Sequence, residues 1–167
     1  MDRQALHLMI NHVPVILSLL GATTALVAVI TKRRAVLLFT LATLTVAGAS
    51  SYPAFWSGGQ ANEQVEERWY VDRAQVHEHE EAAQAAMWMM IVTGVVSGLA
   101  WWMTLRTVRE IRPSAGLLTV VLVLSLFSAA AMAKTSWEGG FITIKNPVLV
   151  NSPPPPGYVK PPRVRDR

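Results

Sequence analysis

Four long uncharged runs leave this sequence few ways to fold in water. They cover residues 13–30, 35–56, 82–105 and 115–133, and none contains Asp, Glu, Lys or Arg. A helix needs roughly 20 apolar residues to cross a hydrocarbon core of about 30 Å. Backbone polar groups in lipid must be satisfied within the segment, so each run is expected to be helical. The sequence predicts an all-α bundle of four transmembrane helices at about residues 12–30, 35–57, 73–105 and 114–134.

The end of the chain differs in composition from the rest. Residues 1–145 are expected to form the transmembrane domain, and residues 146–167 a proline-rich tail outside the membrane. Four consecutive prolines begin at Pro153, and such a run favours an extended polyproline II conformation with no core of its own. Two interpretations of the tail stay open, a disordered end or a strap that lies on a partner subunit.

The charges outside the apolar runs are divided by side. Basic residues dominate the connections at residues 31–34 and 106–114, whereas residues 57–81 carry seven acidic residues against two basic ones. Short loops rich in Lys and Arg mark the cytoplasmic side of a membrane protein. We therefore expect both termini and the acidic segment to lie outside, in the periplasm next to a bacterial inner membrane.

Several classes of function find no support in the sequence. The absence of cysteine excludes disulfides, thiolate ligands and covalent haem attachment. The four runs contain no charged residue of the kind that marks a transport pathway within the membrane. Neither a nucleophile motif nor a phosphate-binding glycine loop is present, and nothing indicates nucleic-acid binding. We therefore expect a membrane protein that is not an enzyme.

All four histidines belong to the outer side. His7 and His12 lie at the entry to the first helix, and His77 and His79 precede the third run. Because these helices start on the same side, the two pairs can meet across the bundle. We expect Asn11 to cap the first helix, and Asp72 with Gln75 to form a capping box at the third.

One pair of histidines is favoured by helical spacing. On the third helix the residues that share a face with the deep Met90 are His79, Ala83 and Ala86, so that face is expected to point into the bundle. His77 points elsewhere. The predicted ligand pair is therefore His12 and His79, with His7 and His77 as weaker candidates.

Three interpretations of this outer cluster stay open. Two neutral imidazoles on facing helices can hold a haem b. A divalent metal could instead be bound by His12 and His79 together with carboxylates of the acidic segment, namely Glu63, Glu66 and Glu80. The third interpretation is a set of hydrated side chains that bind no cofactor. A relay of haems across the membrane is disfavoured, because the inner side has no histidine.

Short segments along the chain suggest a family. They are residues 6–15 (LHLMINHVPV), 59–66 (GQANEQVE), 79–83 (HEEAA) and 135–140 (TSWEGG). On these residues the chain resembles a family of bacterial four-helix predicted membrane proteins of unknown function. In that family a basic residue and a histidine usually follow the glycine pair, whereas Phe141–Lys145 lacks the histidine. The resemblance implies the four-helix architecture, and the arrangement is more distantly similar to small b-type cytochrome subunits.

These observations lead to one functional hypothesis with two alternatives. The chain is expected to be a small membrane subunit of a larger respiratory or photosynthetic electron-transfer complex, holding one haem b at the periplasmic side. The first alternative is a purely structural accessory subunit that docks a partner through residues 146–167. The second is a membrane protein that binds a divalent metal at its periplasmic side. In each case the lipid bilayer and other membrane subunits are the expected partners.

Overall fold

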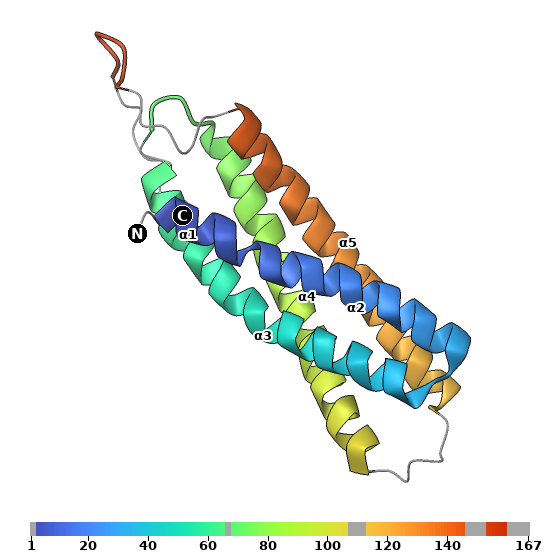
Figure 1. Ribbon diagram of the computed structural model, residues 1–167. Coiled ribbons are helices and arrows are strands. Elements are labelled where there is room, and N and C mark those ends of the chain that lie inside the picture. The colour runs from blue at the N-terminus through green and yellow to red at the C-terminus, as the bar shows by residue number, and fades with distance from the viewer. Residues whose placement is uncertain (1–2, 66–67, 107–112, 146–152, 160–167) are drawn as a thin grey trace.

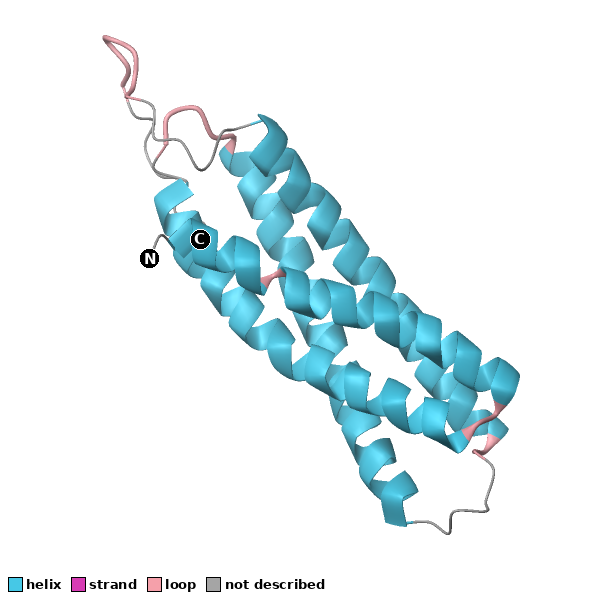
Figure 2. Cartoon of the chain, viewed as in Figure 1, coloured by secondary structure: helices cyan, strands magenta, loops and turns pink. Residues whose placement is uncertain are grey.

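The computed structural model of the chain describes residues 3–65, 68–106, 113–145 and 153–159. Its helices are α1 (Arg3–Ile10), α2 (His12–Thr31), α3 (Arg34–Val65), α4 (Arg73–Arg106) and α5 (Ala115–Lys145). The long helices run antiparallel to their neighbours in sequence, and α5 closes the ring against α2 (Figure 1). Helix accounts for nearly the whole described chain (Figure 2). The predicted all-α four-helix bundle is therefore confirmed.

Four stretches of helix are long and apolar enough to cross a membrane. They are Arg3–Thr31, which includes both α1 and α2, then Arg34–Asn62, Arg73–Arg106 and Ala115–Ile142. Large apolar side chains on the outside of the bundle remain exposed, among them Ile30, Phe127 and Trp137. A soluble protein rarely exposes so much apolar surface, whereas lipid tails solvate it well. The chain is a multi-pass membrane protein.

Two helices extend further than the sequence predicted. α3 continues to Val65 rather than ending near residue 57, and α5 continues to Lys145 rather than ending near residue 134. The prediction stopped where the apolar residues stop. Backbone hydrogen bonding, not hydropathy, decides where a helix ends, so both helices project past the apolar runs. The start of α1, the end of α3, the start of α4 and the end of α5 therefore form a polar extension of the bundle beyond the apolar runs.

The start of the chain is also more helical than predicted. Asn11 has φ −63° and ψ −25°, which is helical, and its side chain makes no capping hydrogen bond. Its backbone N–H donates to the carbonyl of His7 at 2.9 Å. The predicted N-cap is therefore wrong: the chain is already helical before Asn11, and α1 leads into α2 with only a one-residue interruption. This arrangement lays α1 against the projecting end of α3 (Figure 1).

The predicted capping box of α4 is formed only in part. The Asp72 carboxylate accepts a hydrogen bond from the N–H of Ala74 at 3.0 Å, so the helix begins at Arg73 as predicted. The Gln75 side chain does not complete the box, because its Oε1 is buried without a hydrogen-bond partner. One carboxylate is enough to satisfy an amide that the helix start leaves unpaired.

Small residues bring α3 and α4 into backbone contact. A Cβ placed on Gly48 would lie 2.8 Å from Cα of Gly94, closer than real side chains approach. Above and below this crossing the core is filled by fully buried Leu44 and Met90. Close contact of this kind stabilises helix pairs in lipid.

Candidate functional site

A cavity of about 280 Å³ is lined by residues of α1, α2, α3, α4 and α5, and α1 packs on α3 beside it. Most of its wall is apolar, with Phe55, Met87 and Met132 among the lining residues. Polar groups converge on it from α1 and α4, including His7 and His79. A mainly apolar pocket with a few placed polar groups is the usual form of a small-molecule or cofactor site.

His7 reaches the cavity from α1, and its ring contacts α3. Its Nδ1 is 3.0 Å from the hydroxyl oxygen of Ser57, which itself donates to the carbonyl of Ala54 at 2.8 Å. A Cβ placed on Gly58 would lie 3.0 Å from Cε1 of the ring. The imidazole therefore occupies space that only glycine leaves open, and a hydroxyl sets its orientation.

His79 reaches the cavity from α4, and its ring contacts α5. A Cβ placed on Gly139 would lie 3.0 Å from Cε1 of its ring. The ring is close enough to the Glu138 carboxylate and to the backbone of Thr135 to interact with both. Its Nδ1 is buried and has no hydrogen-bond partner. A buried ring nitrogen without a partner carries a cost in free energy, and a ligand would remove that cost.

His79 and His12 both lie close enough to His7 to affect it electrostatically. His7 and His79 are half-buried, in contrast to the exposed side chains of His12 and His77. His7 and His79 are therefore the pair that the fold brings together at the cavity.

The sequence predicted His12 and His79 as the ligand pair, whereas in the structure His7 is more deeply buried than His12. His12 lines the cavity, but its side chain is exposed and its Nδ1 is bonded to the carbonyl of Leu8 on its own turn. His7, predicted as a weaker candidate, takes the inner position because α1 extends the helix and rotates this residue towards α3. His77 is exposed and pairs with Glu81 at 3.3 Å, outside the residues that line the cavity.

The carboxylates predicted for a metal site fall into two groups. Glu80 lines the cavity and is half-buried. The side chain of Glu63 and all of Glu66 lie outside the described residues. Among the side chains that are described, no three His, Asp or Glu residues come together as a metal-binding group. The divalent-metal interpretation therefore stays a prediction that depends on the two undescribed carboxylates.

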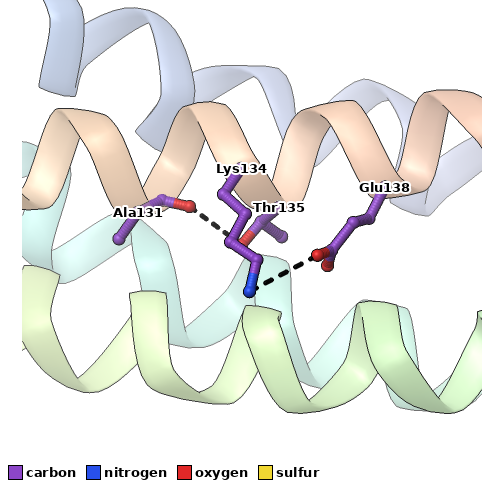
Figure 3. Close-up of polar contacts among 4 residues, drawn as sticks. All are labelled: Ala131, Lys134, Thr135 and Glu138. Atoms are coloured by element: carbon purple, nitrogen blue, oxygen red, sulfur yellow. Dashed lines mark hydrogen bonds and ion pairs between the residues drawn. The ribbon is translucent and has the colours of Figure 1, made fainter.

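The sequence did not predict which residues lie beside the rings of His7 and His79. Glu138 lies on α5, where one carboxylate oxygen is 3.6 Å from Nζ of Lys134 (Figure 3). Its other oxygen is buried without a hydrogen-bond partner, on the side chain that acts on His79. A signal for these residues does exist in the sequence. The pattern Trp-x-Gly-Gly occurs twice, at residues 56–59 and 137–140, and contains Ser57, Gly58, Glu138 and Gly139.

A second hollow of about 410 Å³ opens next to the cavity. Both are lined by Phe55, Gly59, Asn62 and Glu80, and the second also by the exposed side chains of Tyr52 and Trp56. The two hollows therefore adjoin at these four residues, on the side of the cavity formed by α3 and α4.

The arrangement can present two imidazoles to one apolar space, which is suited to binding a metal-containing planar cofactor. Comparison of the chain with family models, with curated proteins and with solved structures gave no match.

Proposed function

We propose that this protein is a small membrane subunit of an electron-transfer complex that holds one haem b between His7 and His79. One observation carries the proposal: two enclosed imidazoles from different helices line one mainly apolar cavity, and each lies against a glycine. Haem iron is commonly bound by histidine, and helical bundles build such sites from facing helices.

The residues around the cavity fit a haem in three ways. The apolar wall suits a porphyrin ring, and the opening beside Tyr52 and Trp56 leaves room for its edge. The unpartnered Nδ1 of His79 and Oδ1 of Asn11 are buried polar atoms of cavity-lining residues. A basic group is also near, because Arg68 donates to the buried Gln4 of the same wall at 2.9 Å.

Each protein group has a stated role in this proposal. His7 and His79 would hold the haem iron, Ser57 would orient the first ring through its hydrogen bond, and the Glu138 carboxylate would act electrostatically on the second. A hydrogen-bonded partner such as Ser57 fixes the orientation of a ligating ring. The apolar wall lowers the local polarity. A bound haem would supply one-electron redox chemistry, so the chain carries electrons and performs no reaction of its own.

The orientation of the protein follows from its charges. Lys32 and Arg33 join α2 to α3, Arg34 begins α3 and Arg106 ends α4, all at the helix ends opposite to those that carry the cavity-lining residues. Under the positive-inside rule, that end faces the cytoplasm of a bacterial cell. The haem would then lie near the periplasmic surface, where it can exchange electrons with a partner subunit or a soluble carrier.

The optical spectrum of the purified protein tests this proposal. We expect a reduced-minus-oxidised spectrum of a b-type haem and about one haem per chain from protein produced with ample haem. His7→Ala and His79→Ala should each abolish this absorbance, because each removes an axial ligand. His77→Ala is the matched control and should retain it, since that ring is exposed and ion-paired away from the cavity.

Two outcomes would contradict the haem proposal. One is a wild-type protein that contains no haem under those conditions. The other is a spectrum that survives His7→Ala but is lost in His12→Ala, which would move the ligand to the exposed ring. Elemental analysis of the same samples distinguishes a divalent metal, since zinc or copper lost in His79→Ala without any haem would support the metal alternative.

One structural observation concerns the alternative in which residues 146–167 dock a partner subunit. Tyr158 packs against Trp69, with ring centroids 6.2 Å apart, so the described part of the tail contacts the α3–α4 connection of its own chain. A strap on a partner subunit stays a prediction. Deletion of residues 151–167 should release the partner if the tail docks it, and should leave haem content unchanged under the proposal made here.

A further inference from the structure

The two imidazoles sit in matching surroundings on different helices. His7 lies in the first helix of the first half of the chain and packs on α3, the second transmembrane helix of that half. His79 lies in the first helix of the second half and packs on α5, the last helix. Each histidine therefore finds its support within its own half of the bundle.

The supporting segments match position by position. Residues 54–59 read Ala-Phe-Trp-Ser-Gly-Gly, and residues 135–140 read Thr-Ser-Trp-Glu-Gly-Gly. In both, the first residue offers its backbone to the imidazole, the fourth residue acts on the imidazole through its side chain, and the fifth is the glycine under the ring. In both, the tryptophan is exposed on the outside of the bundle.

The spacing explains why these roles recur together. A carbonyl at one position and a glycine four residues later stand one turn apart on the same face of a helix. The ring of a histidine on the neighbouring helix can therefore lie on the glycine and reach the turn above it. A Cβ at Gly58 or Gly139 would meet Cε1 of the ring at the same 3.0 Å.

We infer that the cavity consists of two equivalent imidazole half-sites, related by a pseudo-twofold axis along the bundle, that together bind the two faces of one planar ligand. Gly58 and Gly139 are the positioning residues that set the planes of the two rings. This inference rests on the proposed function for the identity of the ligand, a haem with two histidine ligands, but the half-sites are a property of the protein itself.

Adding one methyl group at each glycine tests the inference. Gly58→Ala and Gly139→Ala should each push the adjacent ring by a few tenths of an ångström and lower haem affinity by about tenfold, the size typical of lost support behind a ligand. The electron paramagnetic resonance signal of the remaining haem should also change, because it reports the orientation of the two imidazole planes. Gly116→Ala, whose methyl would meet no protein atom on the same α5, is the control and should bind haem normally.

The result with haem separates equivalent from unequal half-sites. Similar losses in Gly58→Ala and Gly139→Ala would support the inference. A loss in one variant alone, or in neither, would overturn it, provided that both variants unfold at the wild-type temperature in detergent.

A second readout needs no haem. Nuclear magnetic resonance of the haem-free protein in detergent should show through-space contacts from Hε1 of His7 to Gly58 and from Hε1 of His79 to Gly139. Their absence would overturn the half-sites, whatever the cofactor. Their presence in a protein that never binds haem would retain the half-sites and reject the proposed function.

Discussion

The partners of the two histidines differ at one position. Ser57 presents a neutral hydroxyl to His7, whereas the corresponding Glu138 presents a carboxylate to His79. A carboxylate behind a ligating imidazole makes that imidazole a stronger donor and favours the oxidised metal. The two otherwise similar rings should therefore make unequal contributions to the redox potential of a bound haem.

This difference leads to a prediction for Glu138. Glu138→Gln keeps the shape of the side chain and removes its charge, so the reduced haem loses an unfavourable neighbour relative to the wild type. We expect the midpoint potential to rise by on the order of 50 mV, which for a one-electron couple is nearly tenfold in the equilibrium constant. A redox titration followed at the haem absorption band measures the change.

Glu81→Gln provides the control for that titration. Glu81 is exposed and pairs with His77 on the surface of α4, so its charge is screened by water. The potential should move little in this variant. Equal shifts in both variants would show that overall charge, rather than contact with His79, sets the potential.

At the level of the helices, the contact between α3 and α4 depends on two glycines. Gly94→Ala would place a methyl group 2.9 Å from Cα of Gly48, where the backbone of α3 has no flexible end to move aside. Overpacking of this kind costs about 1–3 kcal/mol. We expect a lower unfolding temperature in detergent, measured by circular dichroism.

A control variant on the same helix distinguishes close backbone contact from ordinary side-chain contact. Gly98→Ala lies one turn along the same α4 and would meet only the Thr45 side chain at an ordinary 3.4 Å, so its stability should stay near the wild type. The buried hydrogen bond between Thr93 and Ser128 at 2.8 Å joins α4 to α5 and remains intact in both variants. Equal stability of the two alanine variants would contradict a close backbone crossing at Gly94.

For the whole molecule, the division of charge predicts which end faces out. The chain has no cysteine, so a single introduced thiol can report its own side. Ala74→Cys at the start of α4 and Ala115→Cys at the start of α5 are matched, exposed substitutions at opposite ends of the bundle. A maleimide that cannot cross membranes should label the first in intact spheroplasts and the second only after permeabilisation.

The reverse labelling pattern would place the histidines on the cytoplasmic side. It would contradict the proposed orientation without changing the cavity. Labelling of both positions in intact spheroplasts would indicate a damaged membrane, which a cytoplasmic marker enzyme detects.

Much of the helical frame could be predicted from hydropathy, because a run of some 20 apolar residues has one stable form in lipid. The inward face of α4 was also predictable, since His79, Ala83 and Ala86 share a face with Met90 by helical spacing alone. The ends of the helices were harder to predict. The extensions of α3 and α5 carry polar residues, and hydropathy does not indicate how far a helix continues through such residues.

The candidate site shows where prediction from the sequence stops. By itself the sequence determined that four helices cross a membrane and that every histidine belongs to one side, because burial in lipid and short connections dictate both. Only the tertiary structure showed that His7 is more deeply buried than His12 beside the cavity, and that Gly58, Gly139, Ser57 and Glu138 lie next to the rings of His7 and His79. The reason is physical: these contacts join residues that are 50 to 60 positions apart in sequence, and the rotation of each helix about its axis is set by packing against its neighbours.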